Sequence, residues 1–181
     1  MKALVSLPRR RVLSLGMGAA LALISAPVFA VRGERRLAFD NLHTGESLHT
    51  VYWQDGRYVA EGLAAINHLL RDHRSGEVGS MEPVLLDLLY QLQQRVGLAR
   101  PYEVISGYRS PQTNARLRQH SNGVAKNSLH MEGRAIDVRL PGEALRHLLQ
   151  AARDLRAGGV GYYPRSGFIH LDTGPFRTWD G

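Results

Sequence analysis

Residues 128–137 read SLHMEGRAID, and residues 169–172 read IHLD. The first stretch places His130 seven positions before Asp137, which lies in a strand-like segment, and the second adds His170 in another such segment. Two imidazoles and one carboxylate can hold a catalytic zinc ion and leave one coordination position open for water. By spacing alone, the alternative that these three side chains never meet explains the pattern equally well.

The chain contains no cysteine, so disulfides and thiolate ligands are excluded. Any metal site must therefore use His, Asp and Glu. A mixed imidazole and carboxylate set is typical of a catalytic zinc, because structural sites usually add a fourth protein ligand, most often cysteine. We also expect Gly133 and Ala135 to let the backbone pass close to the metal. The prediction is one Zn²⁺ ion, held by His130, Asp137 and His170.

The first thirty residues predict an export signal. Arginines at positions 9–11 precede an apolar run over residues 12–30 that ends in VFA. A basic start, an apolar middle and small residues before a cleavage point are typical of a secretory signal, and the paired arginines are typical of the twin-arginine route. An uncleaved membrane anchor is the alternative, although the run is short for a span. We expect cleavage after Ala30, a periplasmic location and no stable membrane insertion afterwards.

Residues 31–181 form a chain of the size of one domain with a real core. Loss of the signal lowers the formal charge from +7 to +3, because four basic residues leave with it: Lys2, Arg9, Arg10 and Arg11. A mildly basic domain suits a polyanionic surface such as a cell wall, and its charge is too small to indicate a nucleic-acid partner. We expect a monomer that binds no nucleic acid.

Hydrophobic periodicity predicts an α+β fold, with a small antiparallel sheet that carries the zinc site and helices that flank it. The expected strands lie within residues 36–59 and at 102–106, 135–140, 159–163 and 168–171. The expected helices lie at about residues 63–70, 82–97, 110–119 and 142–157, with a polar loop at 120–128. Residues 31–60 thus form a β-rich N-terminal extension, and residues 80–180 form the core of the domain.

Several separated motifs accompany the ligand candidates in a defined order. They are SGYRSP at 106–111, Asn114, GVA at 123–125, SxHxxGxAxD at 128–137 and FIHLD at 168–172. Together these motifs resemble the LAS-type zinc metallopeptidase superfamily, which includes D-alanyl-D-alanine peptidases, murein endopeptidases and the hedgehog signalling domain. Because of the export signal, the chain is most similar to the exported bacterial murein endopeptidase branch.

The resemblance implies a zinc-dependent endopeptidase that hydrolyses peptidoglycan stem-peptide cross-links through a zinc-activated water. It maps the zinc ligands onto His130, Asp137 and His170, and it directs Arg109 at the substrate carbonyl, where a guanidinium stabilises an oxyanion. An arginine that only caps the next helix is the alternative. A D,D- or L,D-carboxypeptidase and a non-catalytic zinc-containing wall-binding domain are alternative functions, and the export signal disfavours a hedgehog-like role.

One position departs from the family's pattern. Many relatives have a glutamate or histidine a few residues before the last zinc ligand, whereas residues 165–169 read RSGFI here. Asp172 has the same strand parity as His170 and is the candidate catalytic residue, although it could equally orient a ligand histidine from behind. Glu132 and His120 are further candidates for the general base, which stays unassigned.

Aromatic and basic side chains are candidates for substrate contacts. The aromatic residues near the ends of the site strands could line a groove or pack in the core; they are Tyr108, Tyr162, Tyr163, Phe176 and Trp179. Arg177 could receive a carboxylate of the stem peptide, with a solvated basic face as the alternative.

Overall fold

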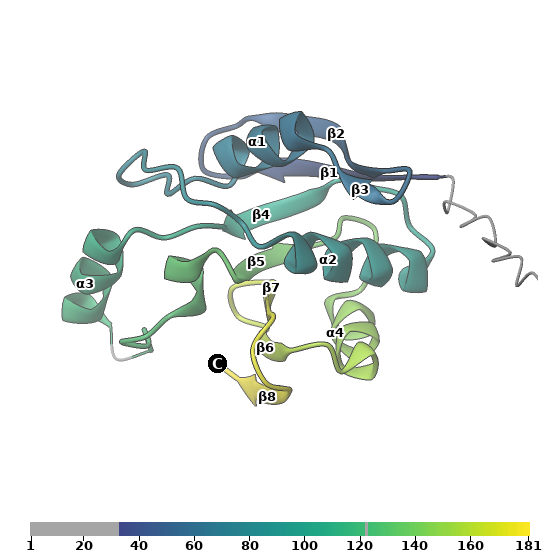
Figure 1. Ribbon diagram of the computed structural model, residues 1–181. Coiled ribbons are helices and arrows are strands. Elements are labelled where there is room, and N and C mark those ends of the chain that lie inside the picture. Colours follow the sequence, from purple (N-terminus) through teal and green to yellow (C-terminus); the bar gives the residue numbers. More distant parts are fainter. Residues whose placement is uncertain (1–32, 122) are drawn as a thin grey trace, which may run out of the picture.

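One eight-stranded sheet organises residues 33–121 and 123–181, the part of the chain that the structure, a computed structural model, describes. The strand order is β3-β2-β1-β4-β5-β7-β6-β8 (Figure 1). The strands are β1 (Glu34–Asn41), β2 (Ser47–Gln54), β3 (Arg57–Tyr58), β4 (Tyr102–Ser106), β5 (Ala135–Arg139), β6 (Gly159–Tyr163), β7 (Phe168–Asp172) and β8 (Arg177–Asp180). The expected export signal, residues 1–30, lies outside the described residues and stays a prediction.

Three of the α-helices contact strands of the sheet. The helices are α1 (Ala60–Leu69), α2 (Pro83–Val96), α3 (Pro111–His120), the 3-10 helix η1 (Leu129–Glu132) and α4 (Leu145–Leu155). Helix α1 packs on β2, α2 contacts β1 and α4, and α4 contacts β6 and β7. Helix α3 stands apart from the other helices, beyond η1 (Figure 1). Within the described ranges, no helix has the length and apolar character needed to cross a bilayer.

The helix boundaries follow from local chemistry. Helix α2 has Pro83 at its first position, where a missing N–H breaks no helical bond, and it ends at Gly97, whose φ is 69°. Helix α3 is capped by the Ser110 side chain, which accepts a hydrogen bond of 3.1 Å from the backbone N–H of Thr113. This cap also fixes the end of the turn that carries Arg109.

The α+β class is confirmed, but the expectation of a small and purely antiparallel sheet is wrong. The sheet is mixed, because β1 pairs with β4 and β6 pairs with β8 in parallel. The strands that carry the site, β5, β7 and β6, are antiparallel to one another as expected. The part of the expected β-rich extension that the structure describes, residues 33–60, continues the same sheet, since β1 joins β4. Both η1 and β8 were missed, because each is short and depends on tertiary contacts.

The hydrophobic core lies between the helices and one face of the sheet. Leu85 and Leu89 of α2 and Ile136 and Val138 of β5 are fully buried, and each such side chain contributes about 1.5–3 kcal/mol relative to an exposed one. Because side chains alternate along a strand, Asp137 lies on the other face of β5. The core therefore fixes the strand from which the site is built.

Gly133 has a different purpose from the expected approach to a metal. Its φ is 67°, and an added Cβ would collide with the carbonyl oxygen of Ser80. The Gly133 carbonyl accepts a hydrogen bond of 2.8 Å from the N–H of Glu82. Glycine at this position ends η1 and docks it against the segment that precedes α2.

Candidate metal centre

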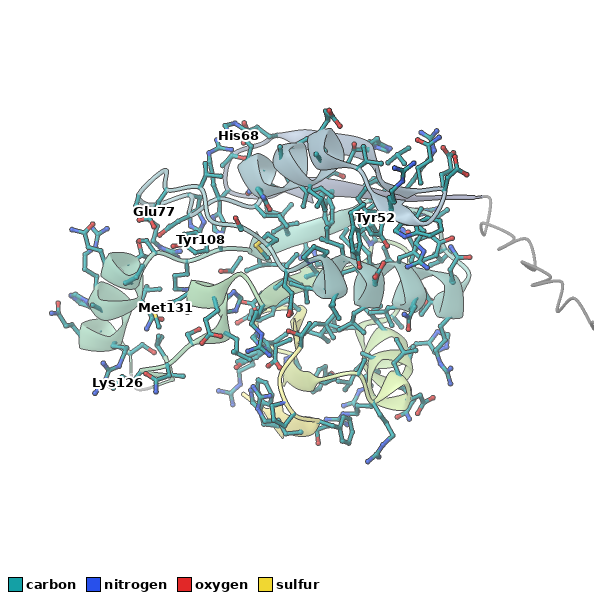
Figure 2. All side chains as sticks on the ribbon, in the orientation of Figure 1. Tyr52, His68, Glu77, Tyr108, Lys126 and Met131 are labelled. Atoms are coloured by element: carbon teal, nitrogen blue, oxygen red, sulfur yellow. The ribbon has the colours of Figure 1, made fainter. Side chains whose placement is uncertain are left out.

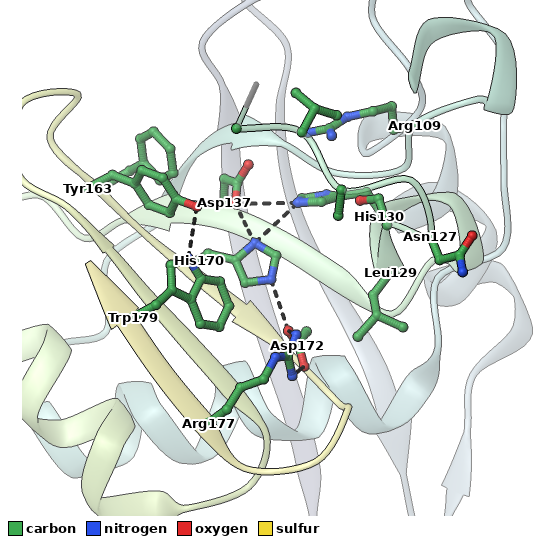
Figure 3. A pocket seen from close by; sticks show the side chains of 15 residues that line it. Arg109, Asn127, Leu129, His130, Asp137, Tyr163, His170, Asp172, Arg177 and Trp179 are labelled. Carbon is green, nitrogen blue, oxygen red and sulfur yellow. Dashed lines mark hydrogen bonds and ion pairs between the residues drawn. The ribbon is translucent and has the colours of Figure 1, made fainter. Parts of the chain in front are cut away.

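Three side chains converge on the outer face of β5 and β7. His130, Asp137 and His170 each offer one ligand atom, and these atoms lie within 4.8 Å of one another. Nδ1 of His170 is 2.8 Å from Oδ1 of Asp137. Nε2 of His130 is 3.3 Å from Nδ1 of His170 and 3.4 Å from Oδ1 of Asp137. The structure thus brings together the three residues that the sequence predicted as ligands (Figure 3).

These separations fit a tetrahedral metal ion. Zinc bonds of about 2.0–2.1 Å place two ligand atoms about 3.3 Å apart in a tetrahedral site. Two of the three separations match this value, and the pair at 2.8 Å is drawn together by a hydrogen bond. The chemistry of the donor set, two imidazoles and one carboxylate, also suits zinc.

In each of the two histidines, the ring nitrogen that points away from the triad makes a hydrogen bond to the protein. Nδ1 of His130 lies 2.8 Å from the carbonyl oxygen of Gly107, to which it donates. Nε2 of His170 lies 3.0 Å from Oδ2 of Asp172, to which it donates. These bonds occupy the outer nitrogen of each ring, so Nε2 of His130 and Nδ1 of His170 are the nitrogens that face Asp137 and would bind a metal ion once Nδ1 of His170 gives up its proton.

Strand register explains why distant residues meet. Five residues lie opposite one another in a row across five strands: Ser106 (β4), Asp137 (β5), His170 (β7), Gly161 (β6) and Trp179 (β8). Directly paired residues share a face of the sheet. The row therefore places a carboxylate, an imidazole and an indole side by side, although the chain separates Asp137 from His170 by 33 positions.

His130 is the candidate ligand that does not belong to the sheet. It lies in η1 and is almost completely buried. The backbone N–H of Arg109 donates a hydrogen bond of 3.1 Å to the carbonyl oxygen of His130. The His130 side chain also donates a hydrogen bond to Gly107. Both the backbone and the side chain of His130 therefore connect η1 to the turn after β4.

The ionisation of the site favours a cation. Burial alone would raise the pKa of Asp137, but the facing His130 and His170 hold it well below its usual range. Burial alone would lower the pKa of His170, whereas its hydrogen bonds to Asp137 and Asp172 raise that pKa to about 8. Two carboxylates thus stay ionised around one imidazole, which is an arrangement that a divalent ion stabilises.

Asp172 lies behind His170, and both oxygens of its carboxylate accept hydrogen bonds from the protein. It is fully buried. Besides His170, it accepts hydrogen bonds from the backbone N–H groups of Gly159 at 3.0 Å and Gly174 at 2.8 Å. The Arg177 guanidinium binds it through two nitrogens, at 2.6 and 3.1 Å. This geometry fits the orienting alternative, because no side of the carboxylate is left to accept a proton from water. The ion pair with Asp172 also engages the guanidinium of Arg177, the candidate for receiving a carboxylate of the stem peptide.

Arg109 presents a guanidinium with weak protein contacts. Its Nη1 and Nη2 lie 3.4 Å from Oδ1 of Asn114 and Oγ of Ser106, and its buried Nε has no partner in the described part of the chain. Burial lowers the pKa of Arg109, and nearby Asp137 opposes that shift. Since Ser110 caps α3, Arg109 is not needed as a cap, and its donors remain available to a substrate.

The triad opens onto a cavity of about 450 Å³, whose walls include Arg109, Tyr163 and Trp179. Glu132 and His120, the further candidates for a base, are not among its lining residues. Tyr163 and Trp179 are site residues that the sequence singled out only within a group of aromatics. The alternating glycines at 159 and 161 were the signal in the sequence that could have indicated a strand packed beside β6, because both face bulky side chains of β8.

Other residues of the aromatic group lie elsewhere. Tyr108 points away from the cavity towards the loop before α2, where its hydroxyl donates a hydrogen bond of 2.8 Å to Glu77 (Figure 2). Tyr162 and Phe176 are also absent from the cavity walls. Only Tyr163 and Trp179 of this group line the site.

Known proteins match the chain over most of its length. The family model Peptidase_M15_2, described as peptidoglycan L,D-endopeptidase MepK, matches residues 30–179. Peptidoglycan L,D-endopeptidase MepK of Escherichia coli (strain K12) is 48% identical over 176 residues, which are 94% of this chain and 96% of the relative. A probable peptidoglycan L,D-endopeptidase MepK of Haemophilus influenzae is 45% identical over 162 residues, 89% of this chain and 84% of the relative.

Proposed function

This chain belongs to the Peptidase_M15_2 family of peptidoglycan L,D-endopeptidases, and on that premise we propose that it is a zinc-dependent endopeptidase that hydrolyses stem-peptide cross-links of peptidoglycan. The observation that carries the proposal is the convergence of His130, Asp137 and His170 on one cavity, at separations that suit a tetrahedral metal. The guanidinium of Arg109 lines the same cavity, so ligands and an oxyanion donor face one space.

The residues of the site have separate tasks. His130, Asp137 and His170 would hold the ion, and Gly107 and Asp172 orient the two imidazoles from behind. A bound zinc ion polarises the scissile carbonyl and lowers the pKa of a water molecule from 15.7 towards about 7. Arg109 donates hydrogen bonds to the carbonyl oxygen as negative charge develops on it, and its burial strengthens this interaction. Asp172 acts through His170, as a positioning residue.

The N-terminal segment supports a site of action outside the cytoplasm. We propose that residues 1–30 are a cleaved twin-arginine signal and that residues 31–181 act in the periplasm as a single monomeric domain. A route that exports folded proteins suits a domain whose metal ligands come from η1 and two strands, because the site exists only after folding.

Digestion of purified sacculi tests the function directly. The mature protein, loaded with one equivalent of zinc, is incubated with sacculi, and the released muropeptides are separated and identified. Cross-linked fragments should disappear in favour of uncross-linked ones, and a chelator should stop this until zinc is restored.

Two other outcomes would contradict the proposal. Removal of only terminal D-alanine would indicate a carboxypeptidase. Unchanged muropeptides together with retained binding to sacculi would indicate a wall-binding domain. The Asp137→Asn variant is the matched control for metal-dependent turnover, because it keeps the size of the side chain and removes the charge.

A further inference from the structure

The cavity beside the triad has few ionisable side chains that remain free to contact a substrate. Among the residues that line it in the described part of the chain, the ionisable side chains outside the triad are those of Arg109, Tyr163, Asp172 and Arg177. Asp172 and Arg177 bind each other through two hydrogen bonds. The hydroxyl of Tyr163 is therefore a second donor in the cavity, besides Arg109, that neither the triad nor the Asp172–Arg177 pair occupies.

The Tyr163 ring is held in place on several sides. It stacks on Phe168 with 4.7 Å between ring centroids and 17° between planes. The backbone of Gly181 lies against the ring so closely that an added Cβ would collide with it. The indole Nε1 of Trp179 donates a hydrogen bond of 3.0 Å to the Tyr163 hydroxyl. A ring packed in this way presents its hydroxyl in one position.

The position of Trp179 is also built into the sheet. Trp179 pairs with Gly161 across β8 and β6, and a Cβ at Gly161 would lie 2.6 Å from Cε2 of the indole. Glycine at 161 thus lets the indole lie flat over β6. From there the indole reaches both Tyr163 and the ring of His170, whose centroid is 5.2 Å away.

The direction of the Trp179 bond decides what the hydroxyl can do. Because Nε1–H of an indole only donates, the Tyr163 oxygen accepts this bond, and its own proton is free to be donated. Figure 3 shows Tyr163 on the side of the triad opposite Arg109. A substrate carbonyl or amide at the triad would thus meet a donor on each side.

We propose, on the basis of the function proposed above, that Tyr163 is a catalytic residue whose hydroxyl donates a hydrogen bond to the scissile peptide group from the side opposite Arg109. Trp179 is then a positioning residue, because it aims the hydroxyl and does not itself contact the reacting atoms. Preoriented donors of this kind act where charge develops in the transition state, so they affect kcat more than KM.

The Tyr163→Phe variant tests this inference, since it keeps the stacked ring and removes only the hydroxyl. With a synthetic cross-linked stem peptide, kcat should fall on the order of 10²-fold while KM and zinc content stay unchanged. Trp179→Phe should lose rate by a smaller factor. Tyr162→Phe is the matched control with wild-type kinetics, because Tyr162 is the neighbouring residue on β6 and lies under Arg146 instead of in the cavity.

Binding of a phosphinate analogue provides a readout without turnover. A phosphinate in place of the scissile peptide group mimics the tetrahedral transition state. Tyr163→Phe should therefore raise the Kd of the phosphinate and leave the Kd of the peptide product of cleavage unchanged. Wild-type kcat in Tyr163→Phe, a change in KM alone, or loss of zinc from this variant would each overturn the inference and leave the proposed function intact. Wild-type protein that neither cleaves the peptide nor binds the phosphinate would overturn the proposed function, and the inference with it.

Discussion

Asp137 and His170 face each other across β5 and β7, with Oδ1 of Asp137 2.8 Å from Nδ1 of His170. Two of the three candidate ligands therefore rest on paired strands of a packed sheet, which is a more rigid support than a loop. Only His130 depends on a short helix outside the sheet. This division of support determines how variants of the site are expected to behave.

Removal of His170 should eliminate stoichiometric metal binding. A site with two remaining ligands holds zinc weakly, so His170→Ala should lose the ion during dialysis, and its metal content can be measured by atomic emission. His147→Ala is the control, because His147 is exposed, contacts Glu143, and is not among the residues that line the cavity. Retention of one equivalent of zinc by His170→Ala would show that the ligand assignment is wrong.

Removal of Arg109 should leave the metal and reduce the rate. Arg109→Ala is expected to lower kcat by about 10²–10³-fold, as loss of one oxyanion donor does, with unchanged zinc content. Arg109→Lys should recover little of this rate, since an ammonium lacks the forked geometry of a guanidinium. Arg57→Ala, on exposed β3, is the control. A wild-type kcat for Arg109→Ala would exclude a catalytic role for this residue.

Asp172→Asn should separate an orienting role from a role as general base. Loss of the carboxylate behind a ligand histidine typically weakens metal affinity by about 10–100-fold. If Asp172 orients His170, kcat of the variant should largely return to the wild-type value at saturating free zinc, set with a metal buffer. A kcat that stays low when the site is fully loaded would identify Asp172 as the proton acceptor instead.

Asp72 should make the protein sensitive to acid. Its carboxylate is only 1% exposed and accepts hydrogen bonds from the N–H and Oγ–H of Ser110 and the N–H of Arg74. Burial alone would raise the pKa of Asp72, but hydrogen bonds from Thr113, Ser110 and Arg74 hold it well below its usual value of 3.8.

The sign of the acid effect follows from this lowered pKa. The stabilisation by Asp72 is complete above the unfolded pKa of about 4 and is lost as the pH falls below it. Asp72→Asn should lower the free energy of unfolding near neutral pH by about 1–3 kcal/mol. The difference from wild type should shrink in acid, as urea denaturation at several pH values would reveal. Parallel pH curves for the two proteins would contradict the assignment.

Export should depend on the paired arginines. Replacing Arg9 and Arg10 by lysine is expected to hold the protein in the cytoplasm with its signal attached, because the twin-arginine route reads both guanidinium groups. Cell fractionation with detection of both precursor and mature forms measures this outcome. Undiminished periplasmic mature protein would indicate another export route.

Local signals in the sequence predicted most elements of the fold. Pro83 before a leucine-rich segment and Gly97 after it marked α2, and a serine cap marked α3. The two missed elements, η1 and β8, lack such signals. Gly133 lets η1 dock against the segment before α2, because a Cβ there would collide with the carbonyl oxygen of Ser80, and β8 exists because it pairs with β6. The parallel pairings that make the sheet mixed, β1 with β4 and β6 with β8, depend on the tertiary arrangement of the strands, which no local pattern reports.

The sequence by itself determined which chemistry is available: imidazole and carboxylate donors, no thiol, and an arginine in a separate motif. Tertiary structure alone decided which atoms face one another. It placed Asp172 behind His170 with its carboxylate fully hydrogen-bonded, left Arg109 with unused donors, and brought Tyr163 into the cavity. The reason is that strand register and hydrogen-bond direction, which depend on how distant segments pack, orient each side chain.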